Sequence, residues 1–175
     1  MADEPTESIV REIDIHARPE TVFEFFIDAD KLTRWLASEA KVDPRPGGEC
    51  IQVHEGGDRR AGPFCMHGEF LEVDPPTRVV FTWGFTNPEL GLPPGSSTVE
   101  VTLQPIASGT RVRLAHSGLP PAEIENHANG WTEMLGRLAR AASAWASKPA
   151  GSNAADRRDS NPTDDNRPTQ APEEP

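Results

Sequence analysis

The sequence contains no tyrosine and only two cysteines, and each shortage narrows the chemistry available to the protein. The absence of tyrosine removes one common general acid. Cys50 and Cys65 form no C-x-x-C pattern, and the opening MADEPTESIV has no basic and apolar leader. We therefore expect free thiols in a reducing, cytoplasmic environment.

Long apolar runs and positive charge are also scarce. No apolar run approaches the roughly 20 residues that a membrane helix needs, so we predict no membrane span. The 17 basic residues are outnumbered by 28 acidic ones, which gives a net charge of −11. Such an acidic surface repels a phosphate backbone, and we expect no nucleic-acid partner.

Familiar catalytic and metal-binding patterns are missing as well. The sequence has no G-x-S-x-G nucleophile elbow, no phosphate-binding G-x-x-x-x-G-K-[ST] loop and no cysteine at a recognisable spacing from a histidine. Cys50, Cys65 and His67 are the only metal ligands that could lie together, and strand alternation puts Cys50 on the opposite face from the other two. We predict neither a metal nor a cofactor.

The length of 175 residues is that of one domain, and the composition changes near Lys148. Residues 148–175 contain five prolines and no Val, Ile, Leu, Met, Phe, Trp, Tyr or Cys. These residues have too few apolar side chains to bury, so burial cannot offset the conformational entropy lost on ordering the backbone, about 1–2 kcal/mol per residue. The composition predicts one domain over 8–147 and a disordered acidic tail over 148–175.

Alternating isoleucines predict a first strand over Ser8–His16. A short helix should begin at Arg18-Pro19-Glu20, where proline is tolerated in the first turn and the acid complements the helix dipole. Asp28-Ala29-Asp30 should end it, and a second short helix should carry Leu32, Trp35 and Leu36. The chain therefore opens with one strand and two short helices.

Residues from Gly47 to His116 show only β patterns, and clusters of Gly, Pro, Asp and Ser divide them into antiparallel strands. If the turns centre near Arg59 and Pro76, the more apolar face should be the inner one. That face comprises Ile51, Val53, Cys65, His67, Glu69, Leu71, Val73, Val79, Phe81, Trp83 and Phe85, and continues with Val99, Val101, Leu103, Val112, Leu114 and His116. The opposite face includes Cys50, Gln52, His54, Phe64, Met66 and Phe70. A bulge in any strand would reverse part of this assignment.

A long amphipathic helix should close the domain. Its apolar positions alternate by four and three residues: Ile124, Ala128, Trp131, Leu135, Leu138, Ala142 and Trp145. This spacing predicts about 25 helical residues, or some 37 Å, with one face against a long apolar surface. Gly130 and Gly136 each cost about 1 kcal/mol relative to alanine inside a helix, and they would permit close approach to the sheet.

Several short motifs follow one another in an order that resembles a known family. They are Ala17-Arg18-Pro19-Glu20-Thr21-Val22-Phe23, Leu32 with Trp35, Pro46-Gly47-Gly48, Gly68-Glu69, Val73-Asp74-Pro75-Pro76, Val80-Phe81-Thr82-Trp83, Gly109-Thr110, His116-Ser117-Gly118 and Gly130-Trp131. Together they resemble the SRPBCC superfamily, and within it the Aha-type family named for activators of the heat-shock-protein-90 ATPase. The resemblance implies an α+β helix-grip fold: a curved antiparallel sheet of about seven strands around a C-terminal helix, with two short helices after strand 1. It also implies a cavity for an apolar ligand, and activation of the chaperone in only some members.

A sheet wrapped around one helix leaves space that a small ligand can fill. Candidate cavity residues are Trp35, His67, Glu69, Phe81, Trp83, His116, Trp131 and Leu135. For each there is a structural alternative. His67 and Glu69 could point outward or pair with each other, His116 and the tryptophans could fill the core, and Trp35 could attach its helix to the sheet.

Three kinds of function remain open at this stage. The first is a carrier or sensor of a small hydrophobic or amphipathic molecule. The second is a cavity enzyme of the cyclase, dehydratase or hydrolase type, which would need His67, Glu69 or His116 to converge on one point. The third is a module that binds a chaperone ATPase through its outer surface, and a homodimer is compatible with any of them.

Overall fold

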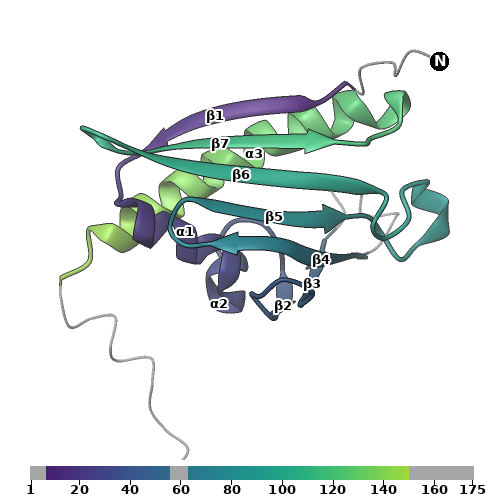
Figure 1. Ribbon diagram of the computed structural model, residues 1–175, viewed down its shortest axis with the longest axis horizontal. Helices are drawn as coiled ribbons and strands as arrows, with labels where there is room; N and C mark the ends of the chain where they lie inside the picture. Colours follow the sequence, from purple (N-terminus) through teal and green to yellow (C-terminus); the bar gives the residue numbers. More distant parts are fainter. Residues whose placement is uncertain (1–6, 56–62, 150–175) are drawn as a thin grey trace, which may run out of the picture.

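The computed structural model describes residues 7–55 and 63–149 (Figure 1). Of the tail predicted over 148–175, all but Lys148 and Pro149 lies outside the described residues. The turn predicted near Arg59 also lies outside them.

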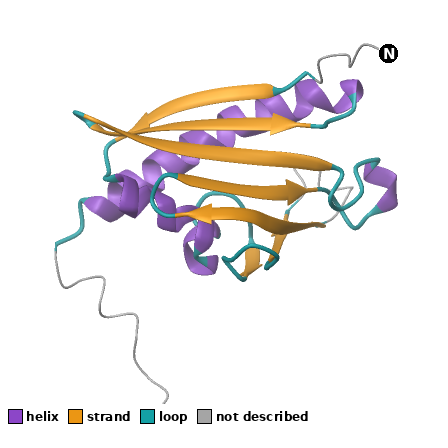
Figure 2. Ribbon diagram, in the orientation of Figure 1, coloured by secondary structure: helices purple, strands orange, loops and turns teal. Residues whose placement is uncertain are grey.

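Eleven elements follow one another along the described chain. They are β1 (Ile9–Ile15), α1 (Pro19–Ile27), α2 (Ala29–Leu32), β2 (Glu39–Val42), β3 (Glu49–His54), β4 (Phe64–Asp74), β5 (Arg78–Trp83), the 3-10 helix η1 (Pro88–Leu90), β6 (Ser97–Ile106), β7 (Gly109–Ser117) and α3 (Pro121–Ala146). The seven strands form one antiparallel sheet in the order β1-β7-β6-β5-β4-β3-β2. The sheet curves in front of α3 in Figure 2, and the predicted α+β helix-grip fold is confirmed.

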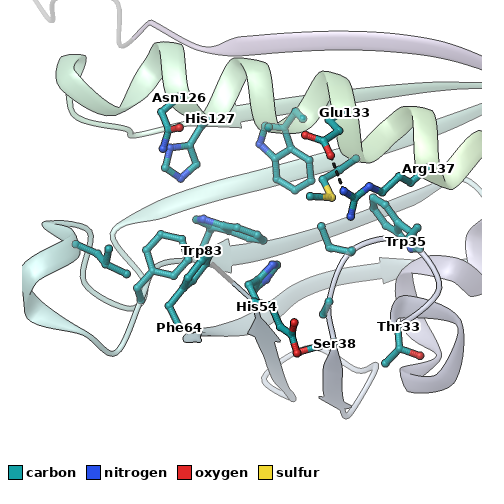
Figure 3. A pocket seen from close by; sticks show the side chains of 18 of the residues that line it. Thr33, Trp35, Ser38, His54, Phe64, Trp83, Asn126, His127, Glu133 and Arg137 are labelled. Atoms are coloured by element: carbon teal, nitrogen blue, oxygen red, sulfur yellow. Dashed lines mark hydrogen bonds and ion pairs between the residues drawn. The ribbon is translucent and has the colours of Figure 1, made fainter. Parts of the chain in front are cut away.

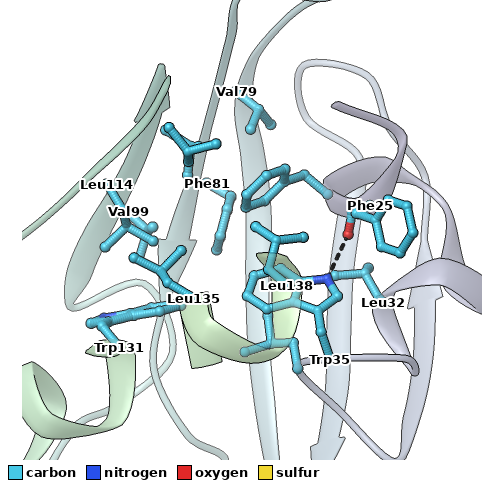
Figure 4. Packing of buried hydrophobic residues seen from close by; sticks show 14 of the residues in the cluster. Phe25, Leu32, Trp35, Val79, Phe81, Val99, Leu114, Trp131, Leu135 and Leu138 are labelled. Carbon is cyan, nitrogen blue, oxygen red and sulfur yellow. Dashed lines mark hydrogen bonds between the residues drawn. The ribbon is translucent and has the colours of Figure 1, made fainter. Parts of the chain in front are cut away.

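The long helix lies along the concave side of the sheet because its apolar side chains form one stripe. Trp131, Leu135, Leu138 and Ala142 are buried, as the four-and-three spacing predicts. Figure 4 shows Leu135 and Leu138 pointing toward Phe81 and the neighbouring strands. The stripe fixes which side of α3 faces the sheet, and therefore which of its residues can line a pocket.

The first short helix packs against the C-terminal end of α3, where the rings of Phe25 and Trp145 lie 6.2 Å apart between centroids. Pro19 occupies the first turn of α1, and the Asp28 side chain caps α2 by accepting a hydrogen bond from the Lys31 backbone N–H at 3.0 Å. Helix α2 ends at Leu32, so Trp35 lies in the turn that follows and not within the predicted helix. Its indole N–H donates to the Phe25 carbonyl at 3.0 Å, which ties this turn to α1 (Figure 4).

The predicted inner face is wrong for β3 and for most of β4, because β4 contains a bulge. Val73 pairs with Val79 as expected, but the register shifts between Phe70 and Glu72, and Phe70 pairs with Phe81. Leu71 and Glu72 therefore both point outward, and Leu71 is 48% exposed. Beyond the bulge the alternation is reversed. The inward side chains there are Cys50, Gln52, His54, Met66 and Phe70, whereas Ile51, Val53, Cys65, His67 and Glu69 lie on the outer face.

Candidate functional site

A pocket of about 780 Å³ opens between the N-terminal half of α3 and the sheet. Four segments enclose it: residues 33–38 after α2, the end of β3 with the start of β4, the end of β5 with the η1 loop, and one side of α3 (Figure 3). The volume is in the range of sites that bind small molecules, roughly 300–1,000 Å³.

The inner part of the pocket is aromatic. Trp35, Trp83 and Trp131 line it, each at most 5% exposed, together with Phe64 and Phe85. The rings of Trp83 and Trp131 are 5.2 Å apart between centroids. These side chains come from four separate segments of the chain, so only the folded protein brings them together.

A buried polar network behind this wall fixes two of the three tryptophans. His116 is fully buried; its Nδ1 accepts from the Trp131 indole N–H at 3.0 Å, and its Nε2 lies 2.8 Å from the Ser97 hydroxyl. That hydroxyl donates to the Trp83 carbonyl at 3.1 Å, so His116 carries its proton on Nε2 and donates to Ser97. Burial, and secondarily the charge of His127, lowers the pKa of His116 to about 3. This neutral histidine positions Trp131 and does not reach the pocket.

A second histidine lines the pocket itself. His54, the last residue of β3, is 8% exposed and its ring stacks on Phe64 with centroids 5.2 Å apart. Burial lowers the pKa of His54 to about 4, and a hydrogen bond from the ring to the Leu36 backbone offsets this only in part. His54 is therefore neutral at pH 7.

The outer part of the pocket is charged. Its lining includes four carboxylates and two guanidinium groups: Glu55, Glu89, Glu123, Glu133, Arg34 and Arg137. Glu133 and Arg137 pair with each other one turn apart on α3 (Figure 3). Among the described lining residues, three carboxylates then remain against one guanidinium group, that of Arg34, so this part of the mouth is negative.

The structure separates the eight candidate residues into three groups. Trp35, Trp83 and Trp131 line the pocket. Phe81, His116 and Leu135 are buried in the core beside it. His67 and Glu69 lie on the outer face because of the β4 bulge. The three side chains considered for acid–base chemistry therefore do not converge, because His116 is in the core and the other two are across the sheet.

Two pocket histidines were not among the candidates. His54 was assigned to the outer face, an error that the bulge explains. His127 lies on α3 four residues before Trp131, hence on the same side of the helix, and its Nδ1 is 2.9 Å from the Glu123 carbonyl. The helical spacing from Trp131 could have identified it.

Neither a metal-ligand cluster nor a membrane-spanning helix occurs in residues 7–55 and 63–149. In those ranges no three or more His, Cys, Asp or Glu side chains are grouped so that they could hold a metal ion. Burial raises the pKa of the Cys50 thiol to about 11, so this thiol is protonated. No helix in the same ranges is long and apolar enough to cross a membrane.

Comparison with known families agrees with the geometry. A family model described as Activator of Hsp90 ATPase homolog 1-like protein matches residues 16–143. The chain belongs to this family. The resemblance predicted from the sequence motifs is thereby confirmed, and the family's helix-grip fold is the one that forms the pocket.

Solved structures show the same fold. A protein from Chromobacterium violaceum is 27% identical with a TM-score of 0.68, over 79% of this chain and 99% of that one. CalU16 from Micromonospora echinospora is 26% identical with a TM-score of 0.61, over 78% and 76% of the two chains. An AHSA1-like protein from Aeromonas hydrophila, solved by NMR, is 22% identical with a TM-score of 0.64, over 79% and 94%. No curated protein matches the sequence.

The outward position of Glu69 leads to a testable prediction. Glu69 lies directly opposite Glu49 in the β3–β4 pair, and like charges at such positions repel. Glu69→Gln should therefore leave the free energy of unfolding unchanged or raise it by up to about 0.5 kcal/mol. Urea denaturation measures this change. A loss above about 1 kcal/mol would show that the carboxylate has a stabilising partner and that the outer-face assignment needs revision.

Proposed function

We propose that this protein binds a small, largely apolar molecule in the pocket beside α3 and acts as a cytoplasmic carrier or sensor of that molecule. The observation that carries the proposal is the aromatic inner wall, in which three buried tryptophans from separate segments face one cavity of about 780 Å³. A folded protein gains stability by filling apolar space, so a cavity of this size favours an apolar occupant.

The polar groups around the pocket support binding in preference to the other functions considered. The three side chains that the sequence offered for acid–base chemistry, His67, Glu69 and His116, are distributed over the core and the outer face. The two histidines that line the pocket, His54 and His127, each hydrogen-bond to the backbone, at Leu36 and Glu123. Ser97 and His116 form a close pair, but both are buried and their hydrogen bonds are directed to Trp83 and Trp131. The free thiols of Cys50 and Cys65 are compatible with a reducing compartment.

Interaction with a chaperone ATPase, which the family description names, would use the outer surface of the sheet and would not require the pocket. The two functions therefore respond differently to a substitution inside the pocket. Filling the cavity should abolish ligand binding and leave a surface interaction intact.

Gly130 offers a way to fill the pocket without disturbing the core. It lines the pocket from α3, and a Cβ at this position would have no atom within 4 Å. Gly130→Trp should weaken binding of the neutral probe N-phenyl-1-naphthylamine at least about tenfold, or 1.4 kcal/mol, because the indole occupies its site. The free energy of unfolding should rise by about 0.5 kcal/mol, since glycine is a poor helix former.

The matched control is Gly136→Trp, on the same helix. Gly136 does not line the pocket, and the nearest atom to its added Cβ is Nη1 of Arg140 at 3.7 Å. This variant should keep the probe affinity of the original protein. Fluorescence titration gives both affinities. Equal binding by all three proteins would place the probe elsewhere, and no binding by the original protein would contradict the proposed function.

A further inference from the structure

The chemistry of the ligand can be inferred from two polar atoms in the lining of the pocket. Nε2 of His54 and Nε1 of Trp83 are buried and have no hydrogen-bond partner in the part of the chain that the structure describes. The two residues are 8% and 5% exposed, and both line the pocket. Buried polar atoms are normally paired, because an unpaired one loses its hydration without compensation. These two atoms therefore indicate what the occupant of the pocket must offer.

The hydrogen bond to Leu36 defines the state of His54. The ring donates to the Leu36 backbone, and since Nε2 has no partner, we assign this donation to Nδ1. A neutral imidazole has one N–H, so Nε2 carries a lone pair and is an acceptor. The stack on Phe64 holds the ring in this orientation. A ligand can satisfy Nε2 only with a hydrogen-bond donor.

Trp83 imposes the complementary requirement. Its indole nitrogen is a donor only, so it needs an acceptor such as an oxygen atom. Its ring contacts His54, with centroids 5.7 Å apart, so the two unpaired atoms belong to neighbouring rings in the wall of the pocket. Figure 3 shows the two side chains on the sheet side of the cavity, facing α3. A hydroxyl group is the simplest ligand group that both donates and accepts.

The charge of the described residues at the mouth disfavours one common class of apolar ligand. In the part of the chain that the structure describes, the lining there has four carboxylates and two guanidinium groups, and Arg137 is already paired with Glu133. A ligand carboxylate would be repelled at this mouth and could not donate to the neutral His54. Fatty acids and other apolar acids are therefore disfavoured.

We propose that the pocket binds a neutral, mostly apolar molecule that carries a hydroxyl group, and that this hydroxyl donates its hydrogen to Nε2 of His54. The inference rests on the proposed ligand-binding function and specifies its ligand class. Phenols and alicyclic alcohols satisfy it. Ethers of the same shape lack the donor, and carboxylates have the wrong charge.

Three probes with one naphthalene ring test the proposal. 2-Naphthol is neutral and has the donor, 2-methoxynaphthalene keeps the oxygen without the donor, and 2-naphthoate is an anion. Calorimetric titration should give binding of 2-naphthol about tenfold tighter than 2-methoxynaphthalene, since the ether leaves Nε2 unpaired, and 2-naphthoate should bind most weakly.

His54→Phe tests whether His54 causes the preference for 2-naphthol over the ether. It removes the acceptor and keeps an aromatic ring against Phe64, so it should bring 2-naphthol down to the affinity of 2-methoxynaphthalene and leave the latter unchanged within about twofold. The matched control is His67→Phe, the same substitution on the outer face, which should preserve the preference for 2-naphthol.

The outcomes separate the inference from the function on which it rests. If the neutral probes bind equally well, or if His54→Phe keeps the preference, the pocket is a binding site but the hydroxyl inference is wrong. If 2-naphthoate binds most tightly, the ligand class is anionic and the inference is also wrong. If no probe binds to the original protein, while it and both variants unfold at similar urea concentrations, the proposed function itself is contradicted.

Discussion

Acidification from about pH 7.5 to pH 5 should lower the free energy of unfolding by about 4 kcal/mol. The cause is the pair of buried neutral histidines, whose pKa values burial lowers to about 4 for His54 and about 3 for His116. In the unfolded chain both titrate near 6.5, so below this pH the unfolded state binds protons that the folded state does not. The stability is fully present above pH 6.5 and is lost as the pH falls toward the folded pKa values.

Urea denaturation at several pH values measures this loss. His54→Phe should remove about half of the pH dependence, because one of the two histidines is gone, while the remaining half comes from His116. His16→Gln is the control, since His16 is exposed at the end of β1. A free energy of unfolding that stays constant over this range would mean that both rings accept protons in the folded protein.

Replacement of Trp131 by alanine should cost about 3–5 kcal/mol. This ring is 4% exposed, contacts Trp83 and donates to His116, so its loss leaves a void and an unpaired Nδ1. The same substitution enlarges the pocket and should weaken binding of N-phenyl-1-naphthylamine. Thermal or urea denaturation gives the stability, and fluorescence titration gives the affinity.

Trp131→Phe separates packing from hydrogen bonding. It keeps most of the ring but removes the indole N–H, so the expected cost is about 1–3 kcal/mol from the unpaired His116. A loss below about 1 kcal/mol for the alanine variant would show that the core refills the space and that Trp131 is not central to it.

The order of the elements was predictable because it depends on long, regular patterns. The seam on α3 extends over about six turns. The Pro and Gly clusters lie between strands or at the start of one: Pro75-Pro76 between β4 and β5, Pro93-Pro94-Gly95 before β6, and Gly109 at the start of β7. By contrast, the four residues of β2, Glu39–Val42, are too few for an alternation to stand out, and this strand was not predicted. Short edge strands form mainly because a neighbouring strand offers a backbone partner, here β3.

The inner face of β4 could not be predicted, because a bulge reverses the face of the sheet on which every residue beyond it lies. Phe70-Leu71-Glu72 contains no glycine that would indicate an irregularity, and apolar residues occur on both faces of the strand. The count of apolar residues assigned Leu71 and Val73 to the inner face. Val73 does pack against the core, whereas Leu71 points outward. His67 and Glu69 were selected as pocket residues, and His54 was overlooked, for this single reason.

The tryptophan cluster was partly predictable from the periodicity of the sequence. Trp83 and Trp131 belong to a regular strand and a regular helix, so their inward direction follows from periodicity. The unpaired state of the Trp83 N–H, however, depends on which donors and acceptors surround it in three dimensions. Sequence alone contains no information on such a contact.

The pairing of β1 with β7 has a consequence for how the protein is made. Ile9 stands opposite His116, so the first strand finds its partner about a hundred residues later in the chain. At a synthesis rate of about 5–20 residues per second, β1 is synthesised roughly 5–20 s before its partner β7. Until then its backbone is an open edge that can pair with other chains. The charged residues Arg11, Glu12 and Asp14, placed between the isoleucines, reduce this risk of aggregation during synthesis.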